Sequence, residues 1–553
     1  MSDGSMISLL YPKDDLEGNP QHATLDISSI ADLSADAIIQ FLRYNSRYFQ
    51  NHKNPIVYFT NDIEVIRYRL DVVEDILNNE SLFILLTKLL PDLENMRELY
   101  LAGKEQSNDI TSSLYSISEL QLYTDCIERL HTHFQKKDLQ LSSLGMKSFV
   151  SEVASVYESE GYQTLKVEAE KISYSVRNIK SITIGVNLDA QLNPVEAGLV
   201  SVNKSYFKSG NIIDKLLRLD FQNDEFTCLA PLEASGKGLS NEQHAKFGSA
   251  VKSTLHSVLM GSVKNWKPAV RSYTNVKSKF LLRLIDEIRF LLGGVSLLRK
   301  LKASGVPICK PHAEYAGKRS FTCKGLYNPM LVLKQEQQPA DVYPSHFIVP
   351  NDIDFDNNSM VYILTGPNQG GKTVFTQAVG IAQLLFQLGL FVPAYSATIS
   401  PVERIYTHFQ NHDNRSSNGR FGEECERLMK IFSKLTQHSL LLMDETFSST
   451  SAAEATYIAE QVLVGLRAAG CRVIFATHLH DLARNINEMN KNSSYTSRID
   501  SLAAKLVEDS SSPGKRSFKI DRARPEGNSY ARDIAEKYGL TLENLLVTLE
   551  EKK

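Results

Sequence analysis

Several classes of protein are excluded by what this 553-residue sequence lacks. Its six cysteines never form a C-x-x-C pair, which argues against a zinc site or a disulfide framework and favours reduced thiols in the cytosol. No apolar run reaches the roughly 18 residues that a membrane-spanning helix needs, and the polar start is not a signal peptide. The formal net charge of −3 provides no general attraction to nucleic acid, so such binding would require a local basic surface. We therefore expect a cytoplasmic protein.

The chain is too long for one hydrophobic core, and two thirds of the way along it contains a phosphate-binding sequence. Residues 366–373 read GPNQGGKT and satisfy the pattern G-x-x-x-x-G-K-[ST]. The apolar run MVYIL before them predicts a buried strand, and the helical spacing of apolar residues after them predicts a helix. In that setting, loop N–H groups and Lys372 bind the phosphates of ATP, while the Thr373 hydroxyl ligates Mg²⁺. The candidate cofactor-binding residues here are Gly366, Pro367, Asn368, Gln369, Gly370, Gly371, Lys372, Thr373 and Val374.

Two later apolar runs end in side chains that can act on a nucleotide. The run SLLLMDE predicts a buried strand that ends in Asp444, a candidate Mg²⁺ ligand, and Glu445, a candidate general base for the attacking water. The run CRVIFATH predicts a third strand, which ends in His478 where an ABC-type ATPase keeps a histidine near the γ-phosphate. An Asp-Glu pair can instead simply begin a helix, and a histidine at a strand end is usually packed or solvated. Their order after the phosphate-binding sequence favours catalytic roles for Lys372, Glu445 and His478.

Taken together, these motifs resemble the ATPase domain of the MutS family over residues 345–540. TGPNQGGKT is similar to that family's TGPNMGGKS, and GLFVPA, LLLMDETFSSTS and FATHLHDL follow in the family's order and spacing. The resemblance implies an ATP hydrolase of ABC type that uses ATP and Mg²⁺. It also implies that Phe347 stacks on adenine, for which an ordinary core phenylalanine is the alternative, and that Asn368 lies near the γ-phosphate.

The chain departs from the family's pattern in two loops. The family's signature G-x-S-T-F-x-x-E reaches the nucleotide of the partner subunit, whereas here RSSNGRFGEECERL has Phe421 and Glu424 but no serine after Gly419-Arg420. Ser417, or its neighbour Ser416, is the candidate substitute. In the loop after Glu445 the family's glycines are replaced, and Thr450 remains. The resemblance therefore implies ATP binding with an altered composite site.

The residues upstream of the ATPase are mainly helical in pattern. Apolar residues recur at helical spacing in 57–99, in 115–171 and in 278–305, whereas 172–204 alternates apolar and polar residues and predicts strands. The resemblance implies that the helices are the core and lever of a MutS protein. It implies further that the strand region is the start of its clamp.

A basic stretch precedes the returning helix. Residues 261–283 contain six basic side chains, three aromatic ones and no acid. We take Lys264, Lys267 and Arg271 as candidate contacts to DNA phosphates. A solvated surface with a basic bias is the more common meaning of such a run and is the alternative.

These observations predict a multidomain chain with an all-α lever and core, a small β-rich clamp insertion, and an α/β P-loop ATPase domain of ABC type. The predicted boundaries are 1–54 for an N-terminal leader and the start of the core, 55–171 for the helical core and lever, 172–277 for the clamp-like insertion, 278–335 for the returning lever helix and a linker, 336–508 for the ATPase domain, and 509–553 for a helical dimerisation tail.

The function that we expect is that of an ATP-dependent, DNA-binding homodimer. It would clamp duplex or branched DNA in repair or recombination, without the family's own mismatch-reading domain, because the core begins close to the start of this sequence. SYARDIAEKYGL, residues 529–540, resembles the family's C-terminal helix that packs on the partner ATPase. The alternative is a ribosome- or RNA-associated ATPase that uses the levers to separate an assembly. A transporter ATPase is disfavoured because no L-S-G-G-Q signature is present.

Overall fold

A computed structural model of the chain divides into two compact units, which we describe separately. Unit 1 comprises residues 1–84, 140–149 and 286–553, and unit 2 comprises residues 85–139 and 150–285. The structure describes residues 7–12, 23–25, 27–44, 54–105, 110–136, 139–177, 181–191, 194–203, 205, 208–209, 227–228, 279–335, 348–356, 359–367, 370–410, 419–491, 495, 497–506, 516–523, 539–542 and 544–545.

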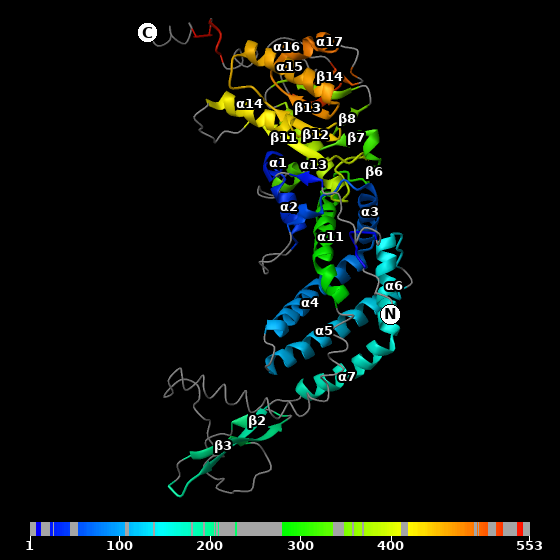
Figure 1. The fold of residues 1–553 in the computed structure, drawn as a ribbon, viewed down its shortest axis with the longest axis vertical. Coiled ribbons are helices and arrows are strands. Elements are labelled where there is room, and N and C mark those ends of the chain that lie inside the picture. The colour runs from blue at the N-terminus through cyan, green and yellow to red at the C-terminus, as the bar shows by residue number, and fades with distance from the viewer. Residues whose placement is uncertain are drawn as a thin grey trace. The chain divides into compact units, whose positions relative to one another are not determined.

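Unit 1 is built on a seven-stranded sheet with the strand order β1-β11-β12-β13-β9-β14-β15. Figure 1 labels four of these strands, β11, β12, β13 and β14. Neighbouring strands pair in parallel from β1 to β14, and β15 pairs with β14 in antiparallel fashion. The three strands predicted from apolar runs are its buried centre, since every residue of β9, β12 and β13 is buried. The strands are β1 Thr24–Leu25, β9 Ser359–Thr365, β11 Arg404–Phe409, β12 Ser439–Asp444, β13 Arg472–Ala476, β14 Arg498–Leu506 and β15 Arg516–Asp521.

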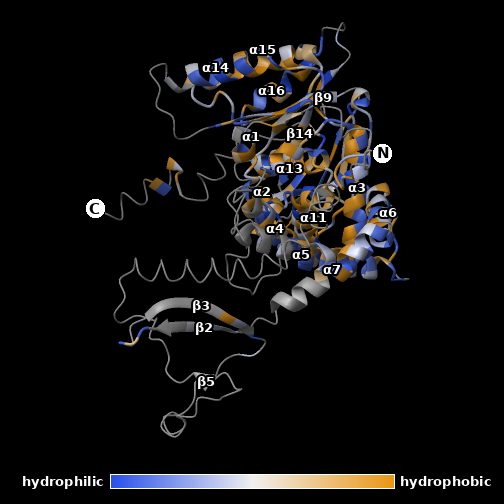
Figure 2. Cartoon of the chain, turned by 60° about the horizontal axis from the view of Figure 1, so that its bottom comes forward, coloured by the Kyte–Doolittle hydropathy of each residue, from blue (hydrophilic) through white to orange (hydrophobic). Residues whose placement is uncertain are grey.

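Helices cover both faces of this sheet. Because side chains alternate along β12, Leu441 and Met443 point into a hydrophobic cluster formed with α14, α15, α16 and α17. Helix α13 packs against β12 and β13 without joining that cluster, and α1 packs against β11. Figure 2 shows hydrophobic residues along α13 and both colours along the amphipathic α14. The helices are α1 Ile27–Asp32, α2 Asp36–Leu42, α13 Lys372–Gln387, α14 Gly419–Phe432, α15 Ala452–Ala469, α16 His480–Arg484 and α17 Ile486–Met489.

A second sheet of unit 1 has the strand order β6-β10-β7-β8. Its strands are β6 His312–Ala313, β7 Phe321–Leu326, β8 Asn351–Phe355 and β10 Ser396–Ile399, accompanied by η4 Ala316–Lys318 and α12 Met330–Gln335. Buried Arg472 at the start of β13 donates hydrogen bonds to the carbonyl groups of Ser320 and Ser400. These bonds link the second sheet to the first.

The helical part of unit 1 centres on α3 Ile63–Asn78, which follows η3 Pro55–Tyr58. The Asp62 carboxylate caps α3 by accepting hydrogen bonds from the N–H groups of Glu64 and Val65. Arg69 of this helix is fully buried and donates to the carbonyl groups of Leu10 and Tyr58. The N-terminal segment Ile7–Pro12 is thereby held inside unit 1.

Unit 2 contains long helices and a β-hairpin. Its helical residues belong to α4 Glu80–Glu105, α5 Ile110–Phe134, α6 Leu144–Glu158, α7 Glu160–Arg177 and α11 Lys279–Ala303, of which α4, α6 and α11 are shared with unit 1. Buried Tyr162 of α7 donates to the carbonyl group of Thr124 on α5, and Lys166 forms an ion pair of 2.7 Å with Glu128. The strands are β2 Ser181–Leu188, β3 Pro194–Asn203, β4 Lys208–Ser209 and β5 Thr227–Cys228, with β2 and β3 antiparallel.

For unit 2 the sequence predicted long helices and a region of strands, and the structure moves the start of that region. We expected strands from residue 172, but α7 continues to Arg177 and the first strand begins at Ser181. Ala169, Ile172 and Val176 recur at helical spacing, which explains the longer helix. Among the described residues, no helix combines the length and apolar character needed to cross a membrane. The five cysteines whose side chains are described are free thiols.

Three segments contain elements that the sequence did not predict. Residues 24–32, expected in a leader, form β1 and α1 on the seven-stranded sheet. Residues 312–335, expected in a linker, supply two strands of the second sheet and α12. Residues 516–521, expected in a helical tail, form the edge strand β15. The first and third of these segments extend the sheet that supports the candidate site.

Candidate nucleotide-binding site

The phosphate-binding sequence lies between the end of β9 at Thr365 and the start of α13 at Lys372. Gly366 and Gly371 have φ angles of +144° and +92°, in a region that other residues rarely adopt. A Cβ atom on Gly366 would also lie 2.6 Å from the Cβ of Ala504 on β14. The two glycines are therefore required for the chain to turn directly from a buried strand into a helix N-terminus, where N–H groups are exposed to an anion.

Lys372 occupies the centre of the site. Its buried Nζ donates to the carbonyl groups of Gly366 and Pro367, at 3.1 and 3.3 Å. It lies 3.4 Å from Nδ1 of His478 and 3.9 Å from Oε1 of Glu445. Burial lowers the pKa of Lys372, and the neighbouring carboxylates act in the opposite direction. These contacts hold the amino group of Lys372 beside the phosphate-binding loop and beside Glu445.

Thr373 and Asp444 meet next to Lys372. The Thr373 hydroxyl donates to Oδ2 of Asp444 at 2.7 Å, while Oδ1 of Asp444 is buried and has no hydrogen-bond partner among the described residues. Burial raises the pKa of Asp444. A hydroxyl group and a carboxylate oxygen without a partner fit Mg²⁺, which takes few protein ligands and completes its shell with water and phosphate oxygens. The described residues contain no group of three or more His, Cys, Asp or Glu side chains that could hold a metal ion.

Glu445 and His478 form a pair at the ends of neighbouring strands. Nε2 of His478 lies 2.8 Å from Oε1 of Glu445, and the N–H group of Glu445 donates to the carbonyl group of Ala476. The backbone of Glu445 has a φ of +53° and that of Phe447 a φ of +68°. Non-glycine residues rarely adopt this conformation, and it concentrates at functional sites. The structure thus brings together Lys372, Glu445 and His478, the three residues for which the sequence suggested catalytic roles.

A cavity of about 720 Å³ opens beside these residues. Several of its walls were not predicted from sequence, since they come from the second sheet and from β15. Asn351 of β8 donates to the carbonyl group of Phe518 and accepts from the N–H group of Ile520, which joins these two walls. No motif marks them. The lining residues are Leu326, Tyr327, Asn328, Leu331, Val349, Asn351, Gly370, Gly371, Lys372, Thr373, Val374, Phe375, Ala378, Glu445, His478 and Phe518.

One predicted cofactor-binding residue that the structure describes, Thr450, does not line the cavity. Its hydroxyl instead donates to Oε2 of Glu454 at the start of α15. Several further candidates lie outside the described residues, so their positions remain predictions: Phe347, Asn368, Gln369, Ser417, Lys264, Lys267 and Arg271.

Fold and site together define a multidomain protein in which long helices are combined with mixed sheets. Residues 362–524 match the family model "MutS domain V", and residues 61–304 match the model "MutS2 N-terminal domain". The chain therefore belongs to the MutS family, as the motifs implied.

Curated relatives share this family but are much longer than the region they match. "DNA mismatch repair protein MutS" of Prochlorococcus marinus (strain MIT 9301) is 40% identical over 146 residues, which are 26% of this chain and 16% of the relative. The proteins of the same name from Chlorobium phaeobacteroides and Chlorobium chlorochromatii are 33% identical over 239 residues and 32% identical over 196 residues. These matches cover 42% and 35% of this chain, and 25% and 21% of the relatives. The chain thus aligns with a quarter or less of each of these three relatives.

Proposed function

We propose that this chain is a MutS-like ATPase that hydrolyses ATP and binds DNA as a homodimer, in DNA repair or recombination. The observation that carries the ATPase proposal is the contact of Thr373 with Asp444 beside the Glu445–His478 pair, at the end of adjacent parallel strands. In open α/β sheets, ligands bind beyond the carboxyl ends of the strands. The cavity at this edge provides room for a nucleotide.

Each residue of the cluster has a separate role in this proposal. The N–H groups at the start of α13 and the amino group of Lys372 bind the phosphates in the ground state. Asp444 and Thr373 would hold Mg²⁺, which neutralises charge on the phosphates. Glu445 accepts a proton from the attacking water, and His478 orients the Glu445 carboxylate through their 2.8 Å contact. The apolar walls that include Leu326 and Leu331 receive the base.

Two substitutions test the ATPase proposal because they separate binding from hydrolysis. Lys372→Ala should abolish nucleotide binding, since Lys372 contacts ground-state phosphates. Glu445→Ala should keep binding and lose hydrolysis, because Glu445 acts mainly as the bond breaks. Equilibrium titration with a fluorescent ATP analogue and phosphate release would measure the two properties. The matched control is Glu460→Gln, which replaces a carboxylate of α15 that accepts a hydrogen bond from Asn485. This variant should behave like the wild type.

One result would contradict the assignment of the general base. If Glu445→Ala hydrolysed ATP at the wild-type rate while Lys372→Ala was inactive, another group would have to activate the water. If the wild-type protein neither bound nor hydrolysed ATP, the whole ATPase proposal would fail.

The DNA-binding proposal is supported by the family, by the printed names of the relatives, and by the basic stretch of residues 261–283. Phosphate contacts from lysine and arginine make affinity fall with rising salt concentration. A gel-shift panel of linear duplex and four-way junction, with and without ATP, tests it directly. Co-sedimentation with ribosomes in the absence of DNA affinity would contradict it and favour the RNA-associated alternative.

A further inference from the structure

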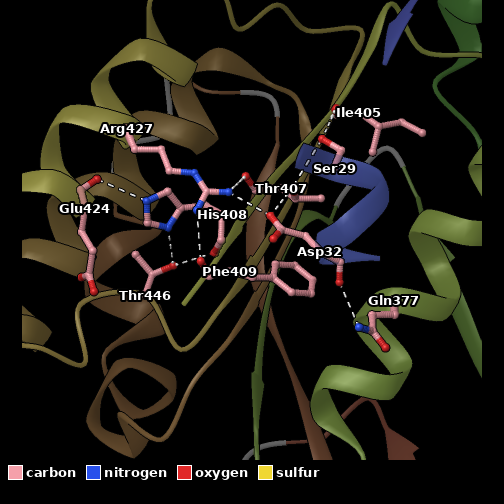
Figure 3. Close-up of polar contacts among 10 residues, drawn as sticks. All are labelled: Ser29, Asp32, Gln377, Ile405, Thr407, His408, Phe409, Glu424, Arg427 and Thr446. Carbon is pink, nitrogen blue, oxygen red and sulfur yellow. Dashed lines mark hydrogen bonds and ion pairs between the residues drawn. The ribbon is translucent and has the colours of Figure 1, made fainter. Parts of the chain in front are cut away.

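The N-terminal helix α1 attaches to the edge of the seven-stranded sheet, on strand β11. Strand β1 pairs only with Arg404 and Ile405, and the Ser29 hydroxyl donates to the carbonyl group of Ile405. Beyond this point no described residue pairs with β11 on that side. Unpaired carbonyl groups at a sheet edge require another donor. Arg427 of α14 supplies it, because its guanidinium donates at 3.1 Å to the carbonyl groups of both Thr407 and Phe409 (Figure 3).

Asp32, the last residue of α1, holds that guanidinium in place. Its Oδ2 accepts from Nη2 of Arg427 at 2.8 Å and from the Thr407 hydroxyl at 2.6 Å. The Asp32 side chain is only 11% exposed, so this charge pair is weakly screened by solvent. The backbone carbonyl of Asp32 accepts from the Gln377 side chain, on α13 one turn after Thr373. Asp32 therefore bonds to α13 through its backbone and to α14 through its carboxylate.

Helix α14 in turn holds the turn that carries Glu445. Oε2 of Glu424 accepts from the N–H group of Phe447 at 3.0 Å, and the carbonyl group of Glu424 lies 3.2 Å from Nε2 of His408. Burial lowers the pKa of His408 to about 4, so its ring is neutral at pH 7. Because a carbonyl group only accepts, Nε2 carries the proton, and Nδ1 accepts from the Thr446 hydroxyl at 3.0 Å. Glu424 of α14 and His408 of β11 thus fix Phe447 and Thr446, the two residues that follow Glu445.

This turn needs such support because Glu445 and Phe447 both have left-handed backbone conformations. If α14 moved, Phe447 would lose its acceptor and Thr446 would lose the histidine that α14 orients. The carboxylate of Glu445 would then leave its position beside His478. The phosphate-binding loop would be unaffected, since the bond from Gln377 to the Asp32 backbone does not involve α14.

We propose that Asp32 is a positioning residue for ATP hydrolysis, which it supports by fixing Arg427 and hence the helix that holds the Glu445 turn. The inference rests on the proposed ATPase function. Asp32 does not line the nucleotide cavity, so it acts through other residues. Its carboxylate should therefore affect the hydrolytic step and leave nucleotide affinity nearly unchanged.

Asp32→Asn tests this directly, because asparagine keeps the size of the side chain and the backbone bond to Gln377 but removes the charge. Charge-assisted hydrogen bonds are about twice as strong as neutral ones, so we expect the loss of charge to lower kcat about tenfold. KM for ATP and the Kd of a fluorescent ATP analogue should stay within about twofold of the wild-type values. Asp36→Asn, which removes an exposed carboxylate of α2 four residues further on, is the matched control and should change neither constant. Arg427→Lys should reproduce the loss in kcat, and the double variant should be less than additive.

Hydrogen exchange provides a second measurement that does not depend on turnover. In Asp32→Asn, the backbone amides of residues 445–447 should exchange faster than in the wild type, while those of residues 374–380 in α13 should not. Arg427→Lys should give the same pattern, and Asp36→Asn should match the wild type. Faster exchange throughout unit 1, with kcat and KM both impaired, would show a general loss of structure and overturn the proposal.

The outcomes separate this inference from the proposed function. A wild-type protein that hydrolyses ATP, together with an Asp32→Asn variant of normal kcat and normal exchange at 445–447, would overturn the role of Asp32 and leave the ATPase intact. A wild-type protein without ATP binding would overturn both. Reduced kcat at constant KM, with faster exchange confined to the turn, supports the role.

Discussion

Glu287 should make the stability of unit 1 depend on pH between about 4.5 and 7. Its carboxylate on α11 accepts from the Leu9 N–H group at 2.6 Å and from the Ser8 hydroxyl at 3.0 Å. Burial raises the pKa of Glu287 from its usual 4.5 to about 7, although these two hydrogen bonds and the charge of Arg69 oppose the change. The group is therefore largely protonated in the folded chain at pH values where it is ionised in the unfolded chain.

The sign and size of the effect follow from this difference. Between pH 4.5 and 7 the folded chain binds more protons than the unfolded one, so the free energy of unfolding falls as the pH rises and levels off above 7. A displacement from 4.5 to about 7 corresponds to about 3 kcal/mol. This is an upper bound, since the side chain keeps some contact with solvent.

Glu287→Gln isolates this contribution because glutamine retains an acceptor for Leu9 and does not titrate. Thermal unfolding of both proteins at pH 5 and pH 8 should show the variant gaining on the wild type as the pH rises, by on the order of 5 °C in Tm. Asp36→Asn, at an exposed carboxylate, should run parallel to the wild type. Parallel curves for Glu287→Gln, or a variant that loses ground with rising pH, would refute the assignment of a buried, protonated Glu287.

Two further predictions concern the proposed partners. Replacing Lys264, Lys267 and Arg271 with alanine should weaken binding to linear and branched DNA about equally. Because three phosphate contacts are lost, the slope of log affinity against log salt should also fall by roughly 2.7 for duplex DNA. Alanine at the exposed Lys88, Lys147 and Lys334 is the control, and an unchanged slope for the first variant would contradict the assignment. Deleting residues 525–553 should convert the proposed dimer into a folded monomer with weak ATPase activity, as measured by light scattering; an unchanged dimer of full activity would rule out the C-terminal helix as its interface.

The catalytic candidates could be predicted because each follows a local pattern at the end of a buried strand. Lys372, the Asp444-Glu445 pair and His478 lie far apart in the sequence, but strands β9, β12 and β13 are adjacent and parallel. The carboxyl ends of adjacent parallel strands meet at one edge of a sheet. The sequence predicted the three strands, and their order in the sheet, which the structure provides, brings these four side chains together.

The walls of the cavity could not be predicted in the same way. Asn351 and Phe518 meet because β8 and β15 lie side by side, and neither strand carries a motif. The role of Asp32 could not be predicted from any local sequence pattern, because its partner Arg427 is 395 residues away. Strand β1, which directs α1 toward this position, has only two residues, too few to show a period.

The turn at residues 445–447 could be predicted in part from a sequence motif, and in part only from contacts made by the folded chain. Sequence alone identified Glu445 as a candidate base, but it did not indicate that Glu445 and Phe447 adopt left-handed conformations. Such a turn is stable only where its surroundings determine it, and here Ala476, His408 and Glu424 each bond to one of its residues. Two of these three supports depend on α14, the helix whose sequence departs from the family's signature. Because Asp32 fixes α14 through Arg427, the placement of the candidate base depends on two residues that are 395 positions apart in the sequence.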